Sequence, residues 1–326
     1  MSFTIGKNFH IIHMTDDIRG LDLWYYDVFS VRRFMPEGYL DKEMRDASLV
    51  MLGDLCVEPL APAFRYDGWN RYPLGKFFTK HGRRIHSLAW YVDDGMSDLF
   101  AALHAEGVEM RGTGGMRLGD TYTDGPVFTH PKYTITQLEF IPAPDKPGGP
   151  SVMADPRYKE GWSPAWWADY HPLQILQHSH TTVTTHDLAK ALDMYVRVLR
   201  GTLLHESDNP GFGTHSAYVL VGHDWVVELA QPTGDGLVQA DMEEHHESAY
   251  AMNFRVRSLA TARRYLALKG VKFIVDDGTS LVADPDTTWG VVFRFTEAEI
   301  PNDPRPSWSQ HVEGEMLMAA HFAPAE

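Results

Sequence analysis

Two stretches of the sequence decide the fold: "FHIIHMTDDIRGLDLWYYDVF" at residues 9–29 and "SHTTVTTHDLAKALDMYVRVL" at residues 179–199. Each starts as a strand, passes through an aspartate that can cap a helix, and continues as an amphipathic run that ends in apolar residues. They are offset by 170 positions, so that His10 falls on His180. This match predicts an internal duplication of a strand-helix unit.

The same offset extends to the strands that follow. The segment "GDLCVEPLAP", from Gly53, matches "GHDWVVELAQP", from Gly222, and places Glu58 on Glu228. In both copies the glutamate stands 48 residues after the matching histidine. Chance explains this repeated spacing poorly, although a duplicated core without a functional site would also preserve it.

A second pair of segments adds two more units. The segment "IHSLAWYVDDGMSDLFAALHAEGVEM", from Ile85, resembles "YAMNFRVRSLATARRYLALKGVKF", from Tyr250, and both read as a strand followed by a helix. Later strands are carried by "YTITQLEFIP" from Tyr133 and "TTWGVVFRF" from Thr287. The chain therefore contains four similar units of strand, helix and strand meander: 8–62, 84–143, 177–233 and 249–297.

These units predict an α+β protein with two repeated domains, each made of two βαβββ units. The expected boundaries are a first domain at 1–145, a linker at 146–174, a second domain at 175–300 and a tail at 301–326. The linker starts rich in Pro and Gly, and its Trp162, Trp166 and Trp167 are expected to pack against a domain or cover a cleft. The tail segment "GEMLMAAHF" fits either a docked helix or an oligomer contact.

Composition excludes several classes of protein. The chain has 326 residues, 44% of them hydrophobic, and a formal net charge of -15 without a basic stripe, which argues against nucleic-acid binding. Its single cysteine, Cys56, excludes an intrachain disulfide framework and suits a reducing cytoplasm. No signal peptide or membrane-spanning run is recognisable. We therefore expect a cytoplasmic protein that acts on a small molecule, as a monomer or homo-oligomer.

Paired strand-helix-meander units resemble the vicinal oxygen chelate superfamily, over nearly the whole chain. This superfamily includes glyoxalase I, bleomycin resistance proteins, extradiol dioxygenases and methylmalonyl-CoA epimerase. The resemblance implies curled mixed sheets around a cup. It also implies one divalent metal ion in the cup, held by side chains from the first and last strands of each unit.

The N-terminal half is most similar to methylmalonyl-CoA epimerase. The likeness is carried by "GDLCVEPLAP", "PLGKFFTKHGRRIHSLAWYVDD" and "FTHPKYTITQLEF". It implies His10, Glu58, His86 and Glu139 as metal ligands. Two imidazoles and two carboxylates suit Fe, Zn, Mn, Co or Ni. Each residue taken singly is better explained as a structural side chain, and only the joint match of all four to ligand positions supports the metal site.

The C-terminal half departs from this pattern. It keeps His180 and Glu228, but Tyr250 and Arg294 occupy the other two positions. A guanidinium cannot ligate a cation, so the metal is expected in the N-terminal cup. An ion pair between Arg294 and Glu228 is one way to fill the degenerate site.

The pairing of units leaves an alternative. If the second unit paired with the third, His86 and Glu139 would join His180 and Glu228 in a complete ligand set. We prefer pairing of the first unit with the second, because the connector between them resembles that of the epimerases.

Three functions compete. The preferred one is metal-assisted proton transfer by an isomerase, epimerase or glyoxalase-type lyase, in which a displaced Glu58 or Glu139 acts as general base. The epimerase family's own catalytic glutamate has no clean match, and Glu43 is the nearest residue, one or two positions out of register.

The second function is ring cleavage at Fe(II) by an extradiol-type dioxygenase, which needs two histidines and one carboxylate with open positions. His10, His86 and Glu139 would supply this face, with Tyr133 and His130 as weaker candidates for acid-base groups. The third is a non-catalytic protein that binds a ligand, as resistance proteins do.

Overall fold

The structure is a computed structural model that describes residues 2–144, 146–147, 149 and 155–309. The strands of the N-terminal half are β1 (Thr4–Met14), β2 (Arg32–Leu40), β3 (Arg45–Leu52), β4 (Leu55–Pro62), β5 (Ile85–Asp94), β6 (Met110–Arg111), β7 (Val127–Thr129) and β8 (Gln137–Pro142). Those of the C-terminal half are β9 (Ile175–Thr184), β10 (Thr202–Asn209), β11 (Thr214–Val221), β12 (Trp225–Pro232), β13 (Ala249–Val256), β14 (Phe273–Asp276), β15 (Ser280–Ala283) and β16 (Val292–Thr296).

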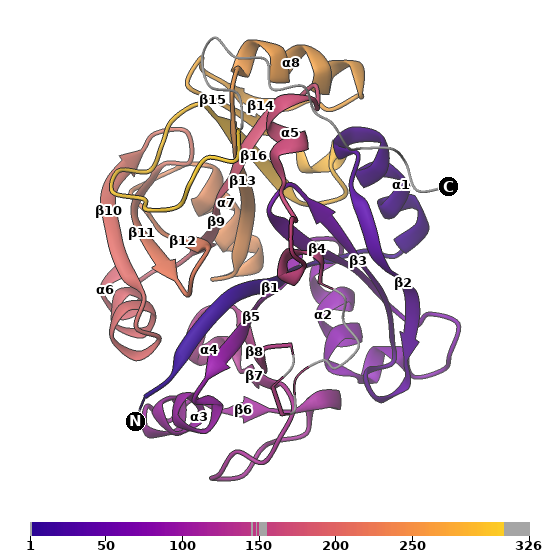
Figure 1. Cartoon of the computed structure of the whole chain (residues 1–326), viewed down its shortest axis with the longest axis vertical. Coiled ribbons are helices and arrows are strands. Elements are labelled where there is room, and N and C mark those ends of the chain that lie inside the picture. The colour runs from indigo at the N-terminus through magenta and orange to yellow at the C-terminus, as the bar shows by residue number, and fades with distance from the viewer. Residues whose placement is uncertain (1, 145, 148, 150–154, 310–326) are drawn as a thin grey trace.

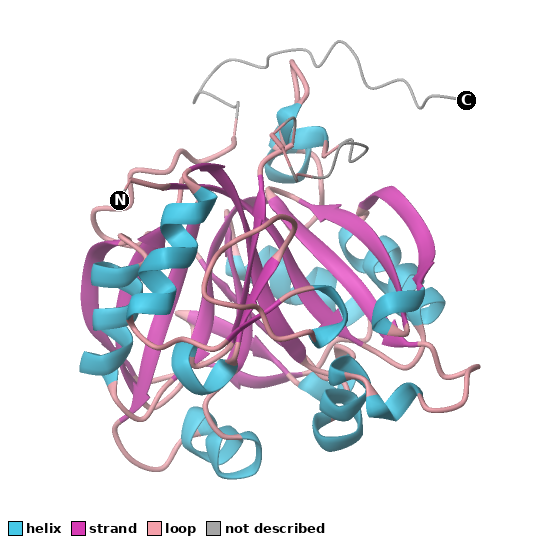
Figure 2. Ribbon diagram, turned by 90° about the horizontal axis from the view of Figure 1, so that it is seen from below, coloured by secondary structure: helices cyan, strands magenta, loops and turns pink. Residues whose placement is uncertain are grey.

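The helices lie around the outside of the strands (Figure 2). They are α1 (Ile18–Phe29), α2 (Pro73–His81), α3 (Met96–Ala105), α4 (Pro131–Thr134), α5 (Ala165–Asp169), α6 (Leu188–Leu192), α7 (Leu237–His245) and α8 (Leu259–Leu268). A π-helical stretch, Asp193–Val198, continues α6. No helix in the described part of the chain is long and apolar enough to cross a membrane.

Each half forms one open, mixed, eight-stranded sheet, and the two sheets have the same strand order (Figure 1). The order is β2-β3-β4-β1-β5-β8-β7-β6 in the first sheet and β10-β11-β12-β9-β13-β16-β15-β14 in the second. The first strands of successive units are antiparallel neighbours at the centre, β1 beside β5 and β9 beside β13. The predicted α+β class with repeated βαβββ units is therefore confirmed, and the units pair within each half.

The predicted helix caps explain where the long helices begin. The Asp17 side chain accepts a hydrogen bond from the Gly20 N–H at 2.9 Å, and Asp187 accepts one from the Lys190 N–H at 3.0 Å. Each cap satisfies a backbone donor that the first helical turn leaves without an intrahelical partner. The duplicated aspartate therefore fixes the same strand-to-helix turn in both halves.

The two halves share one continuous hydrophobic core. From α1, Trp24 packs on Phe293 of the second sheet, with ring centroids 5.6 Å apart. In the opposite direction, Tyr195 donates from its hydroxyl to the Thr134 carbonyl at 3.3 Å. Because α1 and the α6 segment each reach across to the other half, the halves are buried against one another.

The junction repeats the internal symmetry. The Asn8 N–H donates to Asp224 Oδ1 at 2.7 Å, and the His178 N–H donates to Asp54 Oδ1 at 2.7 Å. Both donors belong to the first strand of their half, and both acceptors belong to the opposite half. These two reciprocal hydrogen bonds tie β1 and β9 to the opposite half of the chain. β1 and β9 are the strands that carry the two duplicated histidines.

The tryptophans of the linker pack against the two halves of the chain, which is the first of the two roles expected for them. Trp167 is buried and donates from its indole N–H to the Phe29 carbonyl at 2.8 Å, at the end of α1. Trp162 and Trp166 are partly buried against the same core. The tail segment "GEMLMAAHF" lies outside the described residues.

Candidate metal centre

The four predicted ligands stand on four adjacent strands at the centre of the first sheet. His10 lies on β1, Glu58 on β4, His86 on β5 and Glu139 on β8, and the sheet order places these strands side by side. All four side chains line one cavity of about 420 Å³. The strand pairing within the N-terminal half thus brings them to a common space.

His10 forms the centre of the cluster. Its Nε2 lies 3.0 Å from Glu58 Oε2 and 3.4 Å from Glu139 Oε2, and all three residues are buried. Burial alone would lower the pKa of His10, but the charges of Glu58 and Glu139 outweigh it and raise the pKa. Two carboxylates therefore compete for the same edge of one imidazole.

His86 shares the cavity from the neighbouring strand. Its Nδ1 shares a hydrogen bond with Ser87 Oγ at 3.0 Å, and its ring meets Phe77 edge to face, with centroids 4.5 Å apart. Burial, assisted by the nearby charges of His81 and Arg45, lowers the pKa of His86 to about 3. The ring is therefore neutral at physiological pH, the form in which histidine binds metals.

The cluster is not arranged as a finished coordination sphere. Among the described residues, no group of three or more His, Cys, Asp or Glu side chains converges closely enough to hold an ion as it stands. The structure brings carboxylate oxygens of Glu58 and Glu139 within 3.4 Å of His10 Nε2, and His86 lines the same cavity.

The chemistry of the donors nevertheless fits a divalent ion. Both ring nitrogens of His10 and the Oε2 of Glu58 are buried atoms without a well-aligned hydrogen bond, although His10 Nε2 and Glu58 Oε2 lie 3.0 Å apart. Such atoms are costly to bury, and native structures usually satisfy them. An ion held by one ring nitrogen of His10 and by carboxylate oxygen would satisfy these two ligand atoms, and such ligands suit the borderline metals from Mn to Zn.

Arg45 is a member of the site that the sequence analysis missed. Its Nη1 donates to Glu58 Oε1 at 2.9 Å, and its Nε donates to Glu43 Oε2 at 2.5 Å. Burial opposes its charge, but the two glutamates raise the pKa of the Arg45 guanidinium. Arg45 is the first residue of β3, and Glu43 ends the short turn that precedes this strand.

The weaker acid-base candidates separate in the structure. His130 lines the cavity, but its Nδ1 accepts the Lys132 N–H at 3.2 Å and so caps the short helix α4. Tyr133 is partly buried against the hydrophobic core instead. Glu43 lines the cavity beside its partner Arg45. A role for any of them in acid-base chemistry stays a prediction.

In the C-terminal half, the equivalent glutamate is fully satisfied by protein groups. His180 Nε2 lies 3.2 Å from Glu228 Oε2, as in the first half. Glu228 also accepts hydrogen bonds from the hydroxyls of Thr182 at 2.5 Å and Tyr218 at 3.1 Å. Burial would raise the pKa of Glu228, but the hydrogen bond and charge of His180, then the charge of Arg294 and the Thr182 hydroxyl, outweigh burial and lower the pKa.

The residues at the other two ligand positions pack together in this second cup. Tyr250 packs on Phe212 with ring centroids 5.5 Å apart, and the Arg294 guanidinium lies 5.2 Å from the centre of the same Phe212 ring. The suggested ion pair between Arg294 and Glu228 is not among the ion pairs formed by the described residues. The degenerate site is therefore packed with aromatic side chains, with the arginine stacked on one of them.

Comparison with known proteins gives structural likeness only. No family model matches the chain, and no curated protein sequence does. A solved structure of a mutant 4-hydroxymandelate synthase from Streptomyces coelicolor is similar over 91% of this chain and 94% of its own, with 12% identity and a TM-score of 0.61. Methylmalonyl-CoA epimerase from Mycobacterium tuberculosis is similar over 43% of this chain and 93% of its own, with 21% identity and a TM-score of 0.35.

Proposed function

Because both halves of the chain have the vicinal oxygen chelate fold, we propose that it is a divalent-metal-dependent enzyme acting on a small oxygenated molecule. The observation that carries the proposal is the cluster around His10, where buried donor atoms of His10 and Glu58 have no hydrogen-bond partner. In the C-terminal half His180 Nε2 also lacks a well-aligned hydrogen bond, but hydroxyl groups satisfy the glutamate. The contrast between the two glutamates favours a metal in the first half.

The residues divide into three roles. His10, His86 and Glu139 would hold the ion, and Glu58 would adjoin it while Arg45 keeps its other oxygen occupied. When bound, the ion supplies Lewis acidity toward two neighbouring substrate oxygens and stabilises negative charge that develops on them. The cavity contributes an apolar wall that includes Leu74, Phe77 and Phe128, which suits an aromatic or otherwise hydrophobic substrate.

Between the two reaction classes, Arg45 favours oxygenation. A Glu58 that accepted a substrate proton on Oε2 would lose its negative charge while Oε1 still faces Arg45, and a weakened ion pair is costly in a buried site. With Glu58 held aside, two histidines and one carboxylate remain, the ligand set of non-haem Fe(II) oxygenases. We therefore place ring-cleaving oxygenation of a dihydroxylated aromatic compound first.

Proton transfer is the second candidate, and Glu139 is the observation that favours it. Its Oε2 lies 3.4 Å from His10 Nε2, and no arginine forms an ion pair with it among the described residues. A carboxylate placed in this way is a suitable general base for a proton next to a carbonyl group. An isomerase, an epimerase or a glyoxalase-type lyase would use it.

The test starts from purified protein whose metal is identified by elemental analysis. Apoprotein is then reloaded with Fe(II), Mn, Co, Ni or Zn and offered catechols and hydroquinones in an oxygen electrode. Oxygen uptake with Fe(II) alone supports the oxygenase. Deuterium exchange next to the carbonyl of a 2-oxo acid or thioester, with Zn or Co and without oxygen uptake, would support proton transfer. Failure to bind any ion would contradict both.

A further inference from the structure

A short motif occurs twice outside the four repeated units. The sequence Asp-Pro-Arg stands at residues 155–157 in the linker and again at 303–305, after the last strand. Each copy is followed by a tryptophan, Trp162 or Trp308, and the two indole rings lie edge to face with centroids 6.3 Å apart. The motif therefore follows each half of the chain, and both copies meet at the same end of the molecule.

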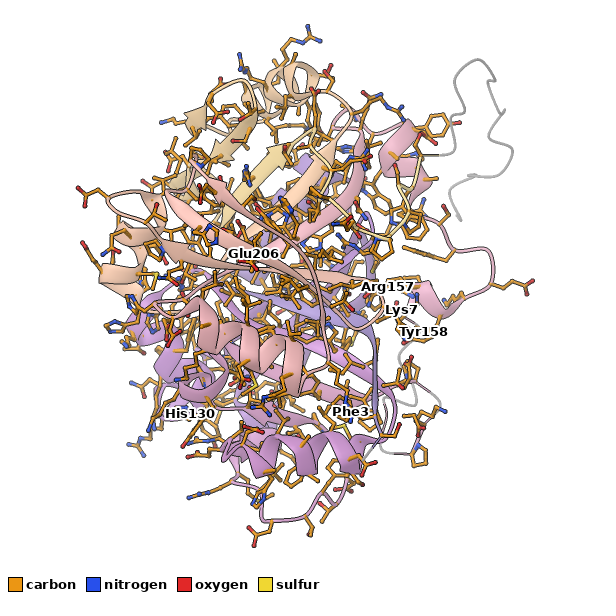
Figure 3. The ribbon with its side chains drawn as sticks, turned by 90° about the vertical axis from the view of Figure 1, so that its left-hand side faces the viewer. Phe3, Lys7, His130, Arg157, Tyr158 and Glu206 are labelled. Atoms are coloured by element: carbon orange, nitrogen blue, oxygen red, sulfur yellow. The ribbon has the colours of Figure 1, made fainter. Side chains whose placement is uncertain are left out.

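The first copy clamps the strand that carries His10. Arg157 Nη2 donates to the Phe9 carbonyl at 2.9 Å, and its Nη1 donates to the side-chain oxygen of Asn8. Asp155 holds the guanidinium from the other side, at 3.0 Å and 2.7 Å. The side chain of Arg157 is only 2% exposed. Figure 3 labels Arg157 close to Lys7, the β1 residue next to Asn8.

The second copy makes the equivalent clamp. Arg305 is held by Asp303 at 3.0 Å and 2.7 Å and donates to the Ser179 carbonyl at 2.5 Å and the His178 carbonyl at 3.2 Å. Ser179 immediately precedes His180, just as Phe9 precedes His10. Each arginine thus fixes the peptide group that leads into the duplicated histidine of its own half.

We propose that Arg157 is the positioning residue for His10, and that it sets the affinity of the N-terminal site for its metal ion. The inference rests on the proposed function. A carbonyl held by a buried guanidinium fixes the peptide plane between Phe9 and His10, and so fixes the direction in which the imidazole leaves the backbone. The Phe9 ring supports the same imidazole, with ring centroids 4.2 Å apart.

An arginine is required for this task. The planar guanidinium group binds one carboxylate with two of its nitrogens, while its other N–H groups donate to two further acceptors. A lysine in its place keeps the charge next to Asp155 but cannot reach the carboxylate, the Asn8 amide oxygen and the Phe9 carbonyl together. Residues that orient metal ligands in this way change metal affinity by about 10- to 100-fold when replaced.

Arg305 provides a matched control inside the same chain, because it makes the same clamp in the half whose cup is filled by side chains. In the full-length protein, Arg157→Lys and Arg305→Lys are compared by Co(II) titration, thermal unfolding of the apoprotein, and hydrogen exchange of the amides at 9–11 and 179–181. We expect Arg157→Lys to bind Co(II) at least about tenfold more weakly and Arg305→Lys to bind it as the wild type does, with similar losses of thermal stability.

The outcomes separate this inference from the proposed function. If the wild type binds Co(II) and Arg157→Lys binds it equally well, or if Arg305→Lys weakens binding to the same extent, Arg157 has no positioning role. If the wild type binds neither Co(II) nor the other ions, the proposed function fails and this assignment fails with it.

Should Arg157→Lys not fold, Asn8→Ala replaces it, because this change leaves the buried ion pair intact and removes only one contact of the clamp. The expected result is again weaker Co(II) binding, and wild-type affinity would overturn the inference.

Discussion

Arg45 Nη1 lies 2.9 Å from Glu58 Oε1, so that a half-buried cation holds one oxygen of a predicted metal ligand. The other oxygen of Glu58 lies 3.0 Å from His10 Nε2 and has no hydrogen-bond partner. One carboxylate therefore faces an arginine on one side and the candidate metal position on the other. Arg45 reduces the negative charge of the site and restrains the glutamate.

Replacement of Arg45 by glutamine should lower the stability of the apoprotein and raise its affinity for Co(II). Without the guanidinium, the buried Glu58 and the half-buried Glu43 lose their partner, and the apoprotein should lose about 2 kcal/mol of unfolding free energy. Removal of a positive charge beside the site should at the same time strengthen Co(II) binding, by about tenfold. Urea unfolding and Co(II) titration measure the two effects.

Arg294→Gln is the control for this prediction, because Arg294 occupies the packed cup of the other half. It should leave Co(II) affinity unchanged. Weaker Co(II) binding in Arg45→Gln would mean that Arg45 serves the metal site by orienting Glu58 rather than by restraining its charge.

The matched histidines of the two halves give a direct test of where the metal lies. His10→Gln should lower metal affinity on the order of 100-fold or more, because the cluster loses its central nitrogen donor. His180→Gln, at the equivalent position, should leave affinity within about twofold, since Glu228 keeps its hydroxyl partners and the second cup is filled. Equilibrium dialysis with quantified metal measures both variants, and equal losses would contradict a site confined to the first half.

Much of the fold was readable from the sequence because the chain contains each signal twice. The aspartates that begin α1 and the α6 segment, and the equal spacing from His10 to Glu58 and from His180 to Glu228, follow from local capping and strand periodicity. Such local rules act in the same way in both copies. They were therefore sufficient for the fold class and for the repeat of the strand-helix unit, whereas His86 and Glu139 were placed at the site only by the resemblance to a known family.

The rest of the site depends on contacts that local patterns do not encode. Arg45 reaches Glu58 across the pairing of β3 with β4, and Arg157 reaches Phe9 over a sequence separation of 148 residues. The contacts of α1 and of the α6 segment with the opposite half also depend on tertiary packing, which local sequence patterns do not encode. The repeated Asp-Pro-Arg motif was visible in the sequence, but only the structure relates it to the strands of the duplicated histidines.

Metal binding should depend on pH through His10. The pKa of this imidazole is raised above its usual value of 6.5 by Glu58 and Glu139, so a proton must leave before a metal can bind. As pH falls through the raised pKa, apparent affinity should decrease by about tenfold per pH unit. His86, with a pKa of about 3, adds no such dependence in this range. Calorimetry in buffers of different ionisation enthalpy should detect a proton release on metal binding that grows as the pH is lowered, and the absence of any release would contradict the assignment of His10.

Stability in acid should be limited in part by His13, which lies on β1 but outside the metal cluster. Its Nδ1 shares a hydrogen bond with the Tyr25 hydroxyl at 2.8 Å, its Nε2 lies 3.0 Å from the Trp289 carbonyl, and burial lowers its pKa to about 4. The folded state therefore binds this proton less readily than the unfolded state, whose pKa is near 6.5. The stabilising contribution is complete above pH 6.5 and is lost as pH falls toward 4, to a total of roughly 3 kcal/mol.

Urea unfolding of the apoprotein at pH 7.5 and pH 5 measures this loss. His13→Gln keeps a donor and an acceptor near Tyr25 and Trp289 but does not titrate, so its unfolding free energy should fall less between the two pH values than that of the wild type. The expected difference is about 2 kcal/mol, because pH 5 lies within the window between the two pKa values. An identical pH dependence in the two proteins would mean that His13 is as easily protonated in the folded chain as in the unfolded one, which its burial between Tyr25 and the Trp289 carbonyl opposes.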